Sequence, residues 1–192
     1  MKTFKQFLSE GKSPTAVMTY GRMNPPTIGH AKLIDHVLSQ PGDHHVFVSH
    51  TQDNKKNPLN GPEKVDLLKK MYPHHKDVFD HSSKEEPSII HMAKRLHAKG
   101  YKHLHVVVGG DRVDEMHKLI HKYNGKEYNF KSIKVTSAGD RDPDAEGAEG
   151  MSASKMRSHA LAGNHSEFMK GLHPALKSHA NELINKIKDR IK

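Results

Sequence analysis

The chain has 192 residues, no cysteine, no tryptophan and a formal net charge of +9, to which 18 histidines can add. This length suits one domain and is too short for two independent enzymatic domains, and the missing cysteines exclude disulfides, thiolate nucleophiles and cysteine zinc sites. No apolar run approaches the roughly 20 residues of a membrane span, so we expect a soluble, cytoplasmic protein with anionic partners.

Strand-like and helix-like segments alternate along most of the chain. In chain order we expect a strand at residues 15–20, a helix at 28–39, a strand at 46–49, a helix at 62–71, a short strand at 77–80, a helix at 88–99, a strand at 104–108, a helix at 113–122 and a strand at 131–137. This alternation predicts an α/β fold, in which a parallel sheet of about five strands carries helices on both faces. Ligands of such sheets bind beyond the carboxyl ends of the strands, so the loops after residues 20 and 108 should share one site.

The last third of the chain departs from this alternation. Residues 138–150 are rich in glycine and carboxylates and are expected to form a mobile loop or lid. From Ser152 onward we expect helices, with breaks near residues 163–164 and 171–174 and a basic amphipathic helix at 175–191. We therefore divide the chain into a tail at 1–12, a domain at 13–160 and a C-terminal helical extension at 161–192.

A first motif joins the first strand to the first helix. Residues 21–30 read Gly-Arg-Met-Asn-Pro-Pro-Thr-Ile-Gly-His. Gly21 lets the backbone approach a phosphate, and Thr27 suits the N-cap of a helix whose first amides face an anion. Gly29 removes a side chain that would block access, and His30 can donate a hydrogen bond to a phosphate oxygen. The motif predicts a phosphate-binding turn, and the plainer alternative is a proline-rich loop with a helix cap.

A second motif lies far along the chain, where another helix should begin. Residues 151–157 read Met-Ser-Ala-Ser-Lys-Met-Arg. Ser152 or Ser154 can cap the helix, and Lys155 and Arg157 supply positive charge. The planar guanidinium of arginine suits phosphate oxygens bidentately. The alternative is an ordinary basic helix start.

Together the two motifs resemble those of the nucleotidylyltransferase superfamily, which carries a TxGH or HxGH signature on a Rossmann-like fold. The form Gly-Arg-x-x-Pro-x-x-x-Gly-His, which includes Arg22, is similar to that of nicotinamide mononucleotide adenylyltransferases. Thr27 stands in place of the first histidine, as in the phosphopantetheine adenylyltransferase branch. The second motif is similar to the family's Ile-Ser-x-Thr-x-x-Arg element.

The resemblance implies a reaction and a site. A nucleotidyl group, foremost adenylyl, would pass from ATP or another nucleoside triphosphate to a phosphate-bearing small molecule, with release of pyrophosphate. Mg²⁺ would be held mainly by the triphosphate. The resemblance implies catalytic roles for Thr27, His30 and Arg157. It implies nucleotide contacts from Gly21, Arg22, Gly29, Ser152, Ser154 and Lys155.

Two further segments fit the same family less specifically. Gly109 and Asp111, which follow the strand at 104–108, resemble the family's Gly-x-Asp element, which lines the nucleotide or acceptor pocket. Lys55 and Lys56 resemble a lysine-bearing loop that reaches substrate phosphates, and which of the two does so stays open. Cytidylyl transfer on the same fold is the alternative reaction.

The first ten residues form a short basic amphipathic segment that the domain does not require. It resembles the capsid-targeting peptides of large tailed phages, which are cut after a Leu-x-Glu sequence. The resemblance implies cleavage after Glu10, a phage origin and a place in the virion head. A frayed first helix is the alternative.

Two other functions stay open. The net charge and the basic C-terminal helix permit non-enzymatic binding of nucleic acid, although most lysine-rich helices are solvated faces. Histidines at positions 44–45, 74–75, 103 and 105 permit a metal site. They lack a recognisable ligand set, so we assign no metal ligand.

Overall fold

The computed structural model describes residues 13–139 and 151–192 of the chain. The expected tail at residues 1–12, with its candidate cleavage site, and nearly all of the expected lid at 138–150 lie outside the described residues. Within the two described ranges, no helix has the length and apolar character needed to cross a membrane.

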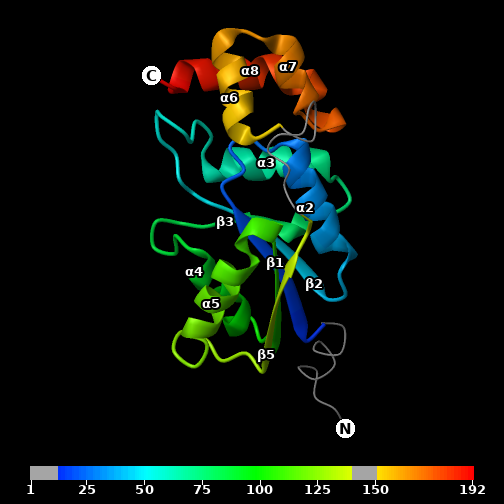
Figure 1. Ribbon diagram of the computed structural model, residues 1–192, viewed down its shortest axis with the longest axis vertical. Helices are drawn as coiled ribbons and strands as arrows, with labels where there is room; N and C mark the ends of the chain where they lie inside the picture. The colour runs from blue at the N-terminus through cyan, green and yellow to red at the C-terminus, as the bar shows by residue number, and fades with distance from the viewer. Residues whose placement is uncertain (1–12, 140–150) are drawn as a thin grey trace.

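A five-stranded parallel sheet forms the centre of the molecule, with strand order β3-β2-β1-β4-β5 (Figure 1). Its strands are β1 (Thr15–Gly21), β2 (Asp43–Val48), β3 (Phe79–His81), β4 (His103–Val108) and β5 (Ser132–Ser137). The predicted α/β class with about five parallel strands is therefore confirmed. The strand order reverses between β1 and β4, and a crevice at the carboxyl ends of the strands is expected at that point.

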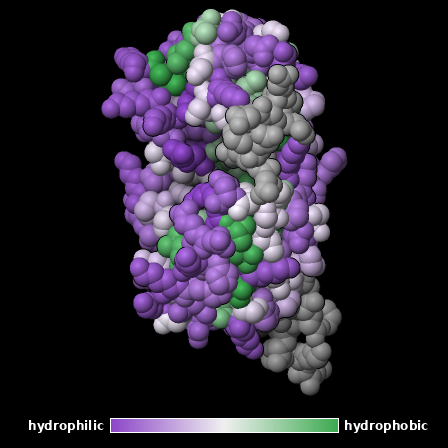
Figure 2. Space-filling view, in the orientation of Figure 1, coloured by the Kyte–Doolittle hydropathy of each residue, from purple (hydrophilic) through white to green (hydrophobic). Residues whose placement is uncertain are grey.

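Four helices cover the sheet, namely α2 (Ile28–Ser39), α3 (Gly61–Met71), α4 (Ile89–Ala98) and α5 (Val113–Tyr123). Side chains alternate along β1, as they must in a strand. Val17 belongs to a core cluster with α2 and α3, whereas Ala16 and Met18 belong to one with α4 and α5. The helices therefore lie on both faces, and the surface seen in Figure 2 is mostly hydrophilic.

The chain ends in a group of helices beyond the carboxyl ends of the strands (Figure 1), namely α6 (Ala153–Ala162), α7 (His165–Lys170) and α8 (Ala180–Arg190). Gly163 ends α6 in the left-handed conformation, with φ of 73°, which explains the predicted break there. The single helix expected at 175–191 is instead a 3-10 segment, Pro174–His179, followed by α8. The His173 side chain accepts a hydrogen bond from the Ala175 amide and so starts this tighter segment.

Two strand boundaries also differ from the sequence-based prediction. β2 begins at Asp43, directly after Gly42, and not at residue 46. Gly42 has φ of 137°, and a Cβ atom there would lie 2.8 Å from the Thr15 carbonyl oxygen, so the close start of the β1–β2 pair requires glycine. β3 starts at Phe79 because the preceding residues, Lys76–Val78, form a 3-10 turn.

Candidate active site

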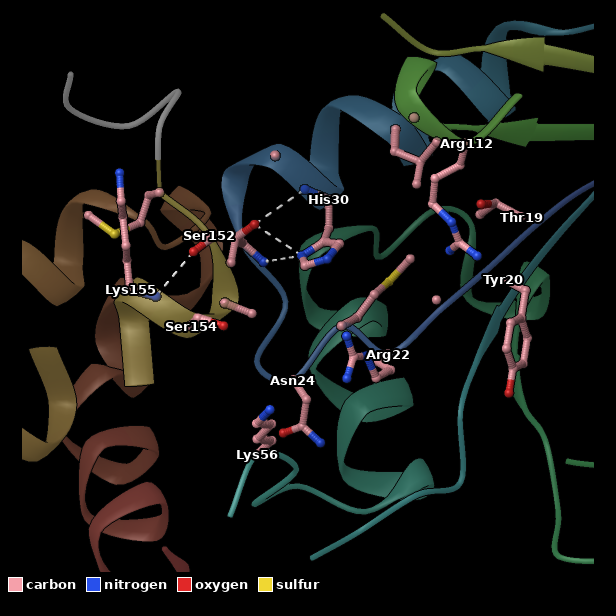
Figure 3. A pocket seen from close by; sticks show the side chains of 18 of the residues that line it. Thr19, Tyr20, Arg22, Asn24, His30, Lys56, Arg112, Ser152, Ser154 and Lys155 are labelled. Atoms are coloured by element: carbon pink, nitrogen blue, oxygen red, sulfur yellow. Dashed lines mark hydrogen bonds between the residues drawn. The ribbon is translucent and has the colours of Figure 1, made fainter. Parts of the chain in front are cut away.

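A cavity of about 630 Å³ opens at the carboxyl ends of β1 and β4, where the strand order reverses (Figure 3). Four segments that are distant in sequence form its wall: the β1–α2 turn, the loop before α3, the β4–α5 turn and the start of α6. A volume of this size suits a small-molecule ligand. The convergence expected from the sequence is therefore observed.

Thr27 and His30 form a reciprocal cap at the start of α2. The Thr27 hydroxyl accepts a hydrogen bond from the His30 amide at 3.4 Å, and His30 Nδ1 accepts one from the Thr27 amide at 3.0 Å (Figure 3). A nitrogen that accepts from an amide carries no proton, so the neutral imidazole holds its proton on Nε2. The cap therefore fixes both the ring and the tautomer that can donate to an anion.

Of the other amides in the first turn of α2, two already donate hydrogen bonds within the protein. The Ile28 amide donates to the Gly171 carbonyl at 2.9 Å, and the Ala31 amide donates to the Thr27 carbonyl at 3.0 Å. Within the described part of the chain, the Gly29 amide has no such partner. A Cβ atom at Gly29 would lie 3.6 Å from the Thr27 hydroxyl, which is ordinary contact, so the protein itself leaves room for a larger residue. Of these first-turn amides, only the one at Gly29 is therefore available to an anion among the described contacts, and Gly29 lines the cavity.

The second motif opens α6 against the same cavity. Ser152 is the N-cap, and its hydroxyl accepts from the Lys155 amide at 3.1 Å. Ser154 accepts from Arg157 Nη2 at 3.0 Å. Ser152, Ser154 and Lys155 therefore line the cavity at the start of α6, where the positive end of a helix dipole lies.

Arg157 connects the second motif to the first. Its Nη1 donates to the Asn24 carbonyl oxygen at 2.7 Å. Burial, and after it the positive charge of Arg22, lower the pKa of the Arg157 guanidinium, and Asp53 partly offsets this. Two guanidinium groups close together in the cavity lining are expected to attract an anion.

The lysine-bearing loop before α3 is held by Asp53. Its Oδ1 accepts from the amides of Lys55, Lys56 and Asn57 at 2.9, 2.7 and 3.0 Å. The first cause of its strongly lowered pKa is the hydrogen bond from the Lys56 amide. Lys56 and Asn57 line the cavity, whereas Lys55 lies outside its lining. Of the two lysines that the sequence left open, Lys56 is the one at the cavity.

The β4–α5 turn supplies the remaining predicted residues. Gly109 and Asp111 line the cavity. A Cβ atom at Gly109 would approach Asp111 Oδ1 to 2.9 Å, so glycine lets the carboxylate fold back over the turn. All the candidate binding and catalytic residues named from the sequence line one cavity except Lys55.

The structure adds residues that sequence reasoning did not assign. Asn24 is buried, and its side chain donates to the Leu59 carbonyl at 2.8 Å and accepts from the Leu59 amide at 3.0 Å, which joins the first motif to the loop before α3. Arg112 and Tyr20 also line the cavity, and the Tyr20 hydroxyl donates to the Pro87 carbonyl at 2.7 Å. The place of Asn24 inside the first motif was the available signal, whereas the roles of Arg112 and Tyr20 depend on tertiary contacts.

Four of the six histidines considered for a metal site have hydrogen-bond partners within the protein, and His45 contacts the Tyr101 hydroxyl at 3.1 Å. His44 contacts the Gln40 carbonyl, His103 the Ser132 hydroxyl and His105 the Thr136 hydroxyl, each at 2.7 Å. Burial first, and then Lys134 and His36, lower the pKa of His105. Among the described residues, no three histidine, aspartate or glutamate side chains come together in a way that could hold a metal ion.

Comparisons with known proteins identify a family and similar folds. The family model described as cytidylyltransferase-like matches residues 18–159. No curated protein matches the sequence. Two solved structures of nicotinic acid mononucleotide adenylyltransferase from Plasmodium falciparum are similar at 15% identity. The structure with NaAD has a TM-score of 0.59, and the match covers 92% of this chain and 98% of that one. The structure with APC has a TM-score of 0.56, and the match covers 91% of this chain and 98% of that one.

A third similar structure comes from Vibrio parahaemolyticus and is assigned as a nicotinate-nucleotide adenylyltransferase. Its TM-score is 0.56 at 12% identity, over 87% of this chain and 99% of that one. At sequence identities this low, the structural similarity shows a shared fold and nothing more specific.

Proposed function

The chain belongs to the cytidylyltransferase-like family of nucleotidyltransferases, and from this premise we propose that it transfers an adenylyl group from ATP to a phosphate-bearing small molecule. An acceptor phosphate oxygen attacks the α-phosphorus in line and forms a new P–O bond. The bond between the α-phosphorus and the bridging oxygen breaks, and pyrophosphate leaves with that oxygen. No covalent enzyme intermediate is required, so the protein acts by positioning reactants and neutralising charge.

The observation that carries this proposal is that His30 and Arg157 line one cavity although they belong to motifs at opposite ends of the domain. The hydrogen bond from Arg157 to the Asn24 carbonyl supports a fixed spacing between the motifs. A polyphosphate held between the starts of α2 and α6 would meet the positive ends of two helix dipoles.

Each side chain then has a specific role. His30, with its proton on Nε2, and the Gly29 amide would donate to the α-phosphate, where negative charge develops during transfer. Thr27 holds the His30 ring through the cap. Ser152, Ser154, Lys155 and Arg157 would bind the β- and γ-phosphates at the start of α6.

Lys56 and Arg22 add further positive charge to the lining of the cavity. Both groups of cations would face a highly charged triphosphate and an acceptor phosphate, whose mutual repulsion must be reduced before they can meet.

Magnesium fits the donor set only as an ion carried by the substrate. Asp111 is the one carboxylate among the described residues that line the cavity, and a single carboxylate suits the way in which Mg²⁺ is bound beside substrate phosphates. The ion would neutralise the charge of the triphosphate when bound.

The choice of base and acceptor rests on similarity. The three structures compared above are of nicotinate-nucleotide or nicotinic acid mononucleotide adenylyltransferases, which favours ATP as donor and a pyridine mononucleotide as the first acceptor to test. The chain has no tryptophan to stack on a pyridine ring. Tyr20, held by Pro87 at the cavity wall, is the aromatic side chain placed to serve.

The test is a thermal-shift panel of ATP, CTP, GTP and UTP with magnesium, followed by pyrophosphate release with nicotinamide or nicotinic acid mononucleotide. We expect ATP to give the largest shift, and turnover to require an acceptor and to be lost in His30→Ala. A shift with CTP alone, followed by CTP-dependent release, would support cytidylyl transfer. A wild-type protein that binds no nucleoside triphosphate would rule out the proposal.

A further inference from the structure

The end of the chain contacts the loop that carries Lys56. Arg190, on the last turn of α8, forms a two-point ion pair with Glu63 on α3, at 2.6 Å and 3.0 Å. The same guanidinium donates to the Pro58 carbonyl at 2.9 Å. Two residues later, the Lys192 amide donates to the Asn54 carbonyl at 3.0 Å. Residues 53–60, hereafter the lysine loop, are therefore held from outside by α8.

Several hydrogen-bond donors stabilise the charged form of the Glu63 carboxylate. Partial burial by itself would raise the pKa of Glu63, but the hydrogen bonds from Arg190, the Asn60 amide and Lys186 outweigh it and lower the pKa to about 2. Glu63 also closes the capping box at the start of α3, since its carboxylate accepts from the Asn60 amide at 3.0 Å. Arg190 thus pairs with a residue in the first turn of α3, directly after the lysine loop.

Inside the lysine loop the restraint continues to the cavity. Pro58, which Arg190 contacts, follows Asn57, whose side chain donates to Asp53 Oδ2 at 2.5 Å. Asp53 in turn accepts from the Lys56 amide. On the far side, Leu59 is fixed to the buried Asn24 of the first motif. The lysine loop is therefore held by the first motif on one side and by α8 on the other. Lys56 is the lysine of this loop that lines the cavity.

We infer that Arg190 is a positioning residue for the cavity, which holds the lysine loop so that Lys56 can contact the phosphates of the nucleoside triphosphate. The inference rests on the proposed function for the identity of that ligand. Arg190 does not line the cavity, so its effect must pass through the loop. Without it, Lys56 would have to be ordered at the moment of binding, and the entropy of that ordering would weaken binding.

The first measurement is the kinetics of Arg190→Ala with ATP and the preferred acceptor. We expect KM for ATP to rise about tenfold, since a charge-assisted phosphate contact is weakened, while kcat stays within about threefold. Arg190→Lys should recover part of the loss, because one contact to Glu63 can be kept. An unchanged KM in Arg190→Ala would overturn the inference.

A double-mutant cycle separates action through Lys56 from a general loss of structure. Lys56→Ala and the double variant Lys56→Ala/Arg190→Ala should have the same KM within about twofold, because Arg190 has nothing left to position. Two effects that multiply would show that Arg190 acts by another route and would also overturn the inference.

Arg95 offers a matched control. On α4 it forms an equally close pair with Glu86, at 2.5 and 3.1 Å, and a bond to Asp80 at 2.9 Å, and it lies outside the cavity lining. Arg95→Ala should lower the free energy of unfolding as much as Arg190→Ala does, but leave KM for ATP unchanged. An equal rise in KM in both variants would mean that only stability matters, which contradicts a positioning role.

Hydrogen exchange separates this inference from the proposed function. In the protein without nucleotide, the Lys55, Lys56 and Asn57 amides bonded to Asp53 should exchange at least about tenfold faster in Arg190→Ala than in wild type or Arg95→Ala. If wild type bound no triphosphate, the proposed function would fail, and this exchange would still show whether Arg190 orders the loop. Equal exchange in all three proteins would overturn the inference by itself.

Discussion

Lys64, a buried lysine with no carboxylate partner in residues 13–139 and 151–192, gives the sharpest test of the energetics of this fold. Its side chain is fully buried in α3, and its Nζ donates to the carbonyl and hydroxyl oxygens of Ser49, at the end of β2. Within the described residues it forms no ion pair. Burial lowers the pKa of Lys64 from 10.5 to about 8. We predict that Lys64→Met stabilises the protein at neutral pH.

The magnitude follows from this pKa difference. At about 1.4 kcal/mol per pKa unit, holding the ammonium in the folded protein costs about 3 kcal/mol. Losing both hydrogen bonds to Ser49 costs about 1–2 kcal/mol. The free energy of unfolding should therefore rise by about 1–2 kcal/mol in Lys64→Met at pH 7, which corresponds to about 3–6 °C in Tm for a chain of this size.

The effect should change sign with pH. Between pH 8 and 10.5 the unfolded chain binds a proton at Lys64 that the folded protein has released, so wild-type stability from this group increases as pH rises through that window. The Lys64→Met variant lacks this increase. Above pH 10.5 the two proteins differ in stability only by the hydrogen bonds to Ser49 that the variant lacks, so the variant should then be the less stable protein. Urea unfolding of both proteins at pH 7, 9 and 10.5 measures the difference. A difference that stays constant over this range would refute the reasoning, as would a variant that is already less stable at pH 7.

The other predictions concern the cavity. His30→Ala should reduce pyrophosphate release about 10²–10³-fold and cost about 1 kcal/mol of stability through the broken cap, as steady-state assays and urea unfolding would show; near-normal turnover would remove His30 from the mechanism. Gly29→Ala should raise Tm slightly, because alanine favours the helix, yet weaken ATP binding at least about tenfold, because its methyl group would stand before the free amide; calorimetry that finds unchanged affinity would contradict that site. Arg157→Lys should lose nearly as much rate as Arg157→Ala, since lysine cannot bond the Asn24 carbonyl and Ser154 together; full activity in the lysine variant would show that charge alone suffices. Finally, the affinity for ATP should fall steeply from about 50 to 500 mM salt, and a flat salt dependence would argue against a site formed by Arg22, Arg157 and Lys56.

Much of the fold could be predicted from the sequence because its signals are local. Hydrophobic periodicity located each strand and helix of the sheet domain. Thr27 was identifiable as a cap from its residue type and position, and Ser152 was one of two candidate caps beside Ser154. Errors fell at boundaries that depend on neighbours, such as the start of β2, where Gly42 passes close to the Thr15 carbonyl.

The candidate site could be predicted only in part. The motifs named the residue types that bind phosphate, and nearly all of those residues line the cavity. The sequence could not decide between Lys55 and Lys56. The choice depends on the loop conformation that Asp53 fixes by accepting hydrogen bonds from the backbone amides of both lysines. The same holds for the Ile28 amide, which is taken by Gly171 from a segment far along the chain.

The sequence by itself thus determined the α/β architecture and the chemical character of the two motifs, because periodicity, capping and glycine placement act over a few residues. The tertiary structure alone decided that Arg157 contacts Asn24, that Arg190 pairs with Glu63 and that Lys64 is buried with no counter-charge among the described residues. These contacts join residues far apart in the chain. Their energies depend on distance and burial in the folded protein, which no local pattern encodes.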